Sequence, residues 1–246
     1  MKLLALLLSL AGCVDANAAP GPAFQSRCDA ALARAAPALS ARQSGYSVDN
    51  SLSYKTLMSM KAADAAHPIV LGLTKAEARV SVGFDGVILP DAASAYECAA
   101  PTFKVAMYYE PIVVYVAREF APGSCAYAEV LAHERRHLNV YLSHLPKAEA
   151  VVRAALARRF REGMLYAPAG QMSARIEHEI DATWMPFVKD EMGKAEDEQA
   201  RIDTFEESER MSKVCAGEVQ SIIKPPTPRS RSHSGTSGQV MNSWTQ

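Results

Sequence analysis

One stretch of the sequence decides how the chain folds: CAYAEVLAHERRHLNVY, which covers residues 125–141. Ser124 stands directly before it and can act as a helix N-cap, because its side-chain oxygen can accept a hydrogen bond from a backbone N–H of the first turn. We predict a helix over residues 125–144. Pro146 is expected to separate it from a second helix over residues 147–166.

The chain downstream is predicted to remain helical. A third helix is expected over residues 171–200, with a kink at Pro186. A fourth is expected over residues 203–217. The residues expected to cap this last helix and to charge its first turn are Asp203, Glu206 and Glu207.

The chain upstream contains strand-like segments. Residues 77–84 alternate in the manner of a half-buried strand. Residues 104–109 and 112–116 are also strand-like, and Glu110-Pro111 between them predicts a hairpin or meander. The remaining predictions are a helix over 24–38, a loop over 39–54 and a short helix over 55–64. Together these segments predict an α+β fold, with a small antiparallel sheet followed by a mainly helical half that carries the 125–144 helix.

The composition fits a single globular domain. The 246 residues are 49% hydrophobic and 22% charged, which suits one domain with extensions. The formal net charge is −1, so the chain lacks the basic excess with which a general nucleic-acid binder neutralises phosphates. We expect one domain over residues 20–224. Residues 225–246 are rich in Pro, Ser, Arg, Gly and Thr and are expected to form a disordered tail.

Residues 1–19 have the pattern of an export signal. Lys2 supplies a positive charge, and residues 3–10 form an apolar run that is far too short to span a bilayer. Cleavage is expected either between Ala18 and Ala19 or before Cys13, which would then carry a lipid anchor. Both alternatives predict export to the periplasm or the outer membrane, without a transmembrane helix in the mature chain.

The cysteines support an oxidising compartment. There are five, and removal or lipidation of Cys13 leaves an even number, four, that can form disulfides. Three pairings are possible, of which we favour Cys98–Cys125 with Cys28–Cys215. No two cysteines form a CxxC pair, so a thiolate zinc site is not expected.

The sequence His133-Glu-Arg-Arg-His137 has the spacing of a metal site. Two histidines four residues apart lie on one face of a helix, about 5–6 Å apart, and can converge on one Zn²⁺ ion. Glu134 is about 100° around the same helix and can reach a zinc-bound water without being a ligand. Zinc lowers the pKa of that water, and Glu134 can then take its proton as a general base.

The same stretch, with the run at 114–119 and the segment at 199–207, resembles bacterial exported proteins of unknown function that are described as predicted secreted zinc-dependent proteases. The resemblance covers about residues 70–215 and depends mainly on the HExxH helix. It implies that His133 and His137 are ligands and that Glu134 is the catalytic carboxylate. Arg136 departs from the zincin pattern, and it either contacts substrate or weakens the protease interpretation.

A catalytic zinc site usually has three protein ligands, so one is missing from this motif. If the predicted helices pack as antiparallel neighbours with turns near residues 146 and 168, the part of the third helix that lies beside residue 135 is near residue 179. Glu179 is therefore the predicted third ligand, and Glu177 is the next alternative.

The sequence therefore predicts a zinc-dependent hydrolase of the cell envelope, and specifically a peptidase that acts on a peptide or protein. The alternative is a non-catalytic envelope lipoprotein or binding and assembly factor with a structural or vestigial metal site.

Overall fold

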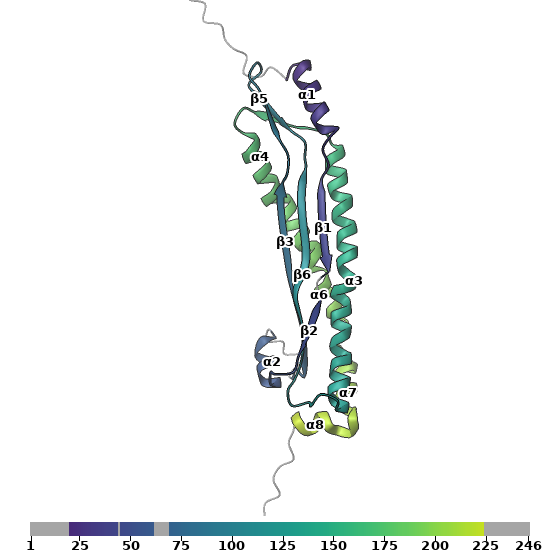
Figure 1. Cartoon of the computed structure of the whole chain (residues 1–246). Coiled ribbons are helices and arrows are strands. Elements are labelled where there is room, and N and C mark those ends of the chain that lie inside the picture. The colour runs from purple at the N-terminus through teal and green to yellow at the C-terminus, as the bar shows by residue number, and fades with distance from the viewer. Residues whose placement is uncertain (1–19, 44, 62–68, 224–246) are drawn as a thin grey trace, which may run out of the picture.

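The computed structural model describes residues 20–43, 45–61 and 69–223. The predicted export signal and the predicted disordered tail lie outside the described residues. The described residues form an elongated molecule of helices and strands, which confirms the predicted α+β class (Figure 1).

The larger sheet is built around one long strand, β6 (Phe103–Val116). β3 (Gly72–Phe84) pairs antiparallel with β6, while β1 (Ala38–Gln43) and β2 (Tyr46–Asp49) pair in parallel with its other edge, one after the other. The sheet is therefore mixed. The predicted loop over residues 39–54 is wrong, because pairing with β6 overrides a local composition typical of loops.

β6 runs without interruption through Glu110-Pro111, so the predicted hairpin or meander is wrong. Ala76 of β3 pairs with Ile112 and Ala78 pairs with Tyr109, which leaves two residues of β6 opposite one residue of β3. This β-bulge shifts the side-chain alternation by one position, and the apolar residues on both sides of it face the core.

A smaller antiparallel sheet lies at one end of the molecule. It contains β4 (Ile88–Asp91), β5 (Tyr96–Ala99) and β7 (Leu165–Pro168). The helix α1 (Pro22–Leu32) packs against it, and it ends earlier than the predicted helix over residues 24–38. At the other end of the molecule, α2 (Tyr54–Met60) confirms the predicted short helix up to residue 60 (Figure 1). Residues 62–64 of that prediction lie outside the described residues.

The helix α3 (Cys125–Arg161) is a single helix of 37 residues that runs beside the sheet (Figure 1). Ser124 caps it as predicted, and its side chain accepts a hydrogen bond from the Tyr127 amide. Pro146 lies inside the helix on its exposed side, where water can hydrate the carbonyl group that loses its partner. The predicted division into two helices at Pro146 is therefore wrong.

Shorter helices follow α3. The predicted third helix is divided into α4 (Met172–Glu179), a π-helical turn (Ile180–Trp184), α5 (Met185–Gly193) and α6 (Ala195–Gln199). Pro186 lies in the first turn of α5, directly after the π-helical turn. The chain ends its described part with α7 (Phe205–Lys213), a 3₁₀ turn (Cys215–Gly217) and α8 (Glu218–Ile223).

Two hydrophobic cores lie between the sheet and α3. The larger core joins the inner face of β6 to the middle of α3 and to α5. The second core lies at the N-terminal end of α3, where the end of β6, α2, α7 and α8 meet. The candidate metal group described below lies beside this second core, because Val130 of the core is only one turn from His133.

Two disulfides connect the four cysteines of the described residues, as the even count predicted. The bonds are Cys28–Cys98 and Cys125–Cys215, so the predicted pairing is wrong. The first joins α1 to β5, and the second joins the start of α3 to the turn before α8. No helix among the described residues has the length and apolar character needed to cross a membrane.

Candidate metal centre

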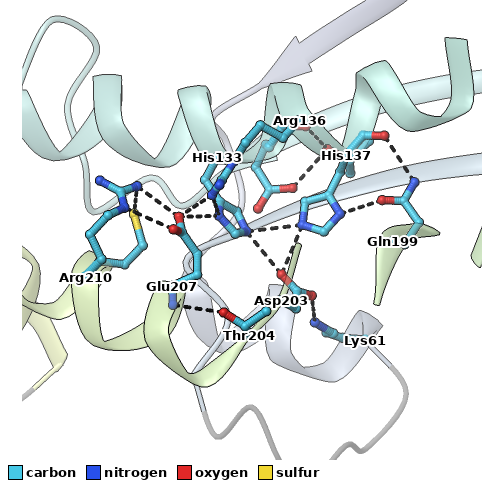
Figure 2. A network of polar contacts seen from close by, with 12 residues as sticks. Lys61, His133, Arg136, His137, Gln199, Asp203, Thr204, Glu207 and Arg210 are labelled. Carbon is cyan, nitrogen blue, oxygen red and sulfur yellow. Dashed lines mark hydrogen bonds and ion pairs between the residues drawn. The ribbon is translucent and has the colours of Figure 1, made fainter. Parts of the chain in front are cut away.

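α3 brings the two histidines of the motif together. His133 and His137 lie one turn apart, their ring centroids are separated by 4.9 Å, and the two Nε2 atoms are 3.2 Å apart (Figure 2). The same nitrogen of each ring therefore points to one place, as the four-residue spacing predicted.

Asp203 completes the group from the loop between α6 and α7. Its Oδ1 atom lies 3.2 Å from Nε2 of His133 and 3.0 Å from Nε2 of His137 (Figure 2). The ligand atoms of the three residues all lie within 4.8 Å of one another, which is close enough to hold a metal ion. The sequence predicted only a capping or charge role here, and the N-cap of α7 is instead Thr204.

Gln199 fixes the orientation of His137. Its Oε1 atom lies 2.6 Å from Nδ1 of His137, and its Nε2 group donates to the backbone carbonyl of the same residue at 3.1 Å. Because the amide oxygen can only accept, Nδ1 of His137 carries the proton. Nε2 then keeps its lone pair and is the nitrogen available to a metal.

Glu207 has the corresponding place beside His133. Its Oε1 atom lies 3.1 Å from Nδ1 of His133, and Arg136 and Arg210 both pair with the same carboxylate (Figure 2). Nη2 of Arg136 also lies 2.7 Å from Nδ1 of His133, and a guanidinium can only donate a hydrogen bond. Nδ1 therefore lies beside one acceptor, Glu207, and one donor, Arg136. A metal on Nε2 requires the tautomer in which Nδ1 donates to Glu207, with Arg136 paired to the same carboxylate.

Two carboxylates of the group are held in their charged form. Hydrogen bonds from Arg210 lower the pKa of Glu207 to about 2 against the opposing effect of burial, and contacts with His133 and Arg136 add to this. Burial raises the pKa of Asp203, but its contacts with His133, His137 and Lys61 outweigh this effect and hold the pKa well below its ordinary value. Nζ of Lys61 lies 2.9 Å from Oδ2 of Asp203, which leaves Oδ1 directed at the histidines.

Glu134 is buried in the same place and is only 4% exposed. The hydroxyl of Thr74 lies 2.9 Å from both its Oε2 atom and its backbone carbonyl oxygen. Burial raises the pKa of Glu134 above its ordinary value, while His137, His133 and the Thr74 hydrogen bond oppose that rise in part. Glu134 also lines, with His133, His137 and Asp203, a cavity of about 500 Å³.

Glu179, the predicted third ligand, is not brought to the histidines. Its carboxylate accepts two hydrogen bonds from Arg159, at 2.7 and 3.0 Å, and one from the indole of Trp184 at 3.2 Å. Glu177 lies exposed on α4. The physical reason is that α3 is continuous. Because the chain does not turn at residue 146, the chain near residue 179 does not come back alongside the histidines.

A signal for Asp203 was present in the sequence. Gln199, Asp203 and Glu207 repeat at intervals of four, the interval that also separates the two histidines. All three of these residues contact the histidine pair. Comparisons with protein-family models, with curated proteins and with solved structures found no match for this chain.

Proposed function

We propose that the protein is a zinc-dependent hydrolase that cleaves peptide bonds outside the cytoplasm. One observation carries the proposal: Nε2 of His133, Nε2 of His137 and Oδ1 of Asp203 converge within 4.8 Å of one another, in a cavity that Glu134 also lines.

The donor set fits zinc. Two imidazole nitrogens and one carboxylate oxygen are common ligands of catalytic zinc, which keeps a fourth position open for water or substrate. The surrounding contacts fit as well, because each imidazole has a partner for its other nitrogen, Gln199 for His137 and Glu207 for His133. Such partners hold the ring orientation and the tautomer that a metal requires.

The roles of the side chains follow from these contacts. A zinc ion bound here would polarise the substrate carbonyl and lower the pKa of the attacking water. Glu134 would accept the proton of that water and pass it to the leaving amine, since its raised pKa makes its carboxylate a better base than an ordinary glutamate. Thr74 would hold the Glu134 carboxylate in place through the hydrogen bond to Oε2.

Export is part of the proposal. Two disulfides and the lack of a membrane-crossing helix among the described residues are compatible with an exported protein. We place the protein in the periplasm or at the outer membrane, where Cys13 could provide a lipid anchor, and propose a peptide or protein as its substrate.

The decisive experiment combines metal analysis with one isosteric substitution. Protein purified without added metal should contain one zinc per chain and should cleave a pool of unstructured peptides. Glu134→Gln should lower the cleavage rate by about 10²–10⁴-fold while zinc stays bound. Glu149→Gln is the matched control, because Glu149 lies on the same helix and pairs with Arg153.

Two results would contradict the proposal. Full activity in Glu134→Gln would show that Glu134 is not the general base. Zinc-free protein whose melting temperature does not respond to a chelator would instead support a non-catalytic envelope factor.

A further inference from the structure

The lining of the cavity beside the candidate metal group contains two unlike sets of side chains. One set is the metal group itself together with Glu134. The other set, which we call the aliphatic lining, comes from the chain before and at the start of β3, from α3 and from the C-terminal helices. It contains Val70, Leu71, Leu73, Val130, Met211 and Val219.

The aliphatic lining belongs to the edge of the second hydrophobic core. Val130 and Val219 are at most 1% exposed and Met211 is 8% exposed, so packing holds them in place, whereas Leu71 and Leu73 are half-buried and offer apolar surface. An apolar group placed against these two leucines would be removed from water without any unfolding of the protein.

The charged side chains that line the cavity are engaged by other residues. Glu207 pairs with Arg136 and Arg210, and Asp203 pairs with Lys61. Glu196 accepts a hydrogen bond from Tyr141 at 3.0 Å. A charged substrate side chain would therefore have to break an existing pair, whereas an apolar one would not.

We infer that the aliphatic lining of the cavity binds a large apolar side chain of a peptide, next to the bond placed at the metal group. This inference rests on the proposed hydrolase function and names its substrate class: peptides with leucine, isoleucine, methionine or phenylalanine beside the cleaved bond. About 500 Å³ is enough for such a side chain with part of its backbone.

A peptide suits the cavity better than a fatty acid does. Ser208, Ser212 and Gln220 bring polar groups to the lining, and β3 pairs only with β6 among the described strands, so its other backbone edge can meet amide groups. A fatty acid would need a cation for its carboxylate, but Lys61 and Arg136 are both paired with acids.

Two serines offer a matched pair for the test. Ser212 lines the cavity and Ser221 does not, yet each donates the same kind of hydrogen bond to a backbone carbonyl three residues earlier. Ser212→Phe adds a ring at the cavity wall without removing a core side chain. Ser221→Phe adds the same ring on an exposed surface.

Binding is measured on zinc-loaded Glu134→Gln protein, so that no turnover is required. The probes are blocked octapeptides that differ only at the central residue, which is Leu, Ala, Lys or Glu. The Leu peptide should bind at least tenfold more tightly than the Lys and Glu peptides. Ser212→Phe should abolish that preference and leave the Ala peptide unchanged, and Ser221→Phe should change neither.

Equal affinity for the four peptides, or a Leu preference that survives in Ser212→Phe, would overturn the inference. Binding of dodecanoate without binding of any peptide would overturn it in favour of a lipid. A third outcome separates the two proposals. If the unsubstituted protein cleaves no peptide but its Glu134→Gln variant binds the Leu peptide selectively, the apolar pocket is supported and the hydrolase proposal fails.

Discussion

Gly72 lies directly against Glu134. A Cβ atom at residue 72 would be 2.7 Å from both Cγ and Oε1 of Glu134, and 2.8 Å from Cγ1 of Val130. β3 can therefore approach α3 closely enough for Thr74 to reach the Glu134 carboxylate only because residue 72 has no side chain.

Gly72→Ala should consequently displace either β3 or the Glu134 side chain. We expect the free energy of unfolding to fall by about 1–3 kcal/mol and peptide cleavage to fall by more than the stability loss explains. Gly83→Ala is the control, because Gly83 lies on the same strand and a Cβ there would meet nothing within 4 Å. Urea unfolding and cleavage rates measure both effects, and identical behaviour of the two variants would contradict the role given to Gly72.

Asp203 and Glu179 can be compared directly as zinc ligands. Asp203→Asn should lower zinc affinity by more than about 100-fold, because a neutral amide replaces the carboxylate beside both histidines. Glu179→Gln should leave zinc affinity unchanged but lower the free energy of unfolding by about 1–3 kcal/mol, since Arg159 loses its charged partner. Competition with a chromophoric chelator gives the zinc affinities. A larger loss of affinity in Glu179→Gln than in Asp203→Asn would favour Glu179 as the third ligand.

Gln199 should act through His137. Gln199→Leu removes the acceptor for Nδ1 of His137, so we expect zinc affinity to fall by about 10–100-fold. Gln220→Leu is matched to it, because Gln220 lines the same cavity from α8. The idea fails if the two variants bind zinc equally well. The spectrum of the cobalt-substituted protein offers an independent measure of ligand geometry.

The two disulfides should differ in their effect on the metal group. Replacing either pair by alanine should lower the free energy of unfolding by about 2–5 kcal/mol. Only the loss of Cys125–Cys215 should also weaken zinc binding. This bond ties the segment between α7 and α8 to the start of α3, and these two helices carry Glu207 and Val219. Loss of Cys28–Cys98 acts at the opposite end of α3. Equal effects of both changes on zinc affinity would contradict this account.

The local parts of the fold and of the site follow from the sequence. The helix that starts after Ser124 and the convergence of His133 and His137 depend on contacts between residues close in sequence, so an N-cap residue and a spacing of four residues predict them directly. The strand over residues 77–84 pairs with the distant β6, but the alternation of its own residues predicts it.

The features that the sequence mispredicted depend on tertiary packing. Pro146 is tolerated within α3 because it faces water, and Glu110-Pro111 is accommodated within β6 by a bulge opposite β3. The local sequence around each proline does not reveal these surroundings. The error at Pro146 then carried over to the third ligand, because the choice of Glu179 assumed a turn that α3 does not make.

The length of α3 also sets a reach. At 1.5 Å per residue, its end at Arg161 lies about 40 Å from the histidine pair, and α1 packs beside that far end. A lipid on Cys13 would be joined in sequence to α1, at the end of the molecule away from the cavity. The anchor and the substrate cavity would then belong to opposite ends of the same long helix.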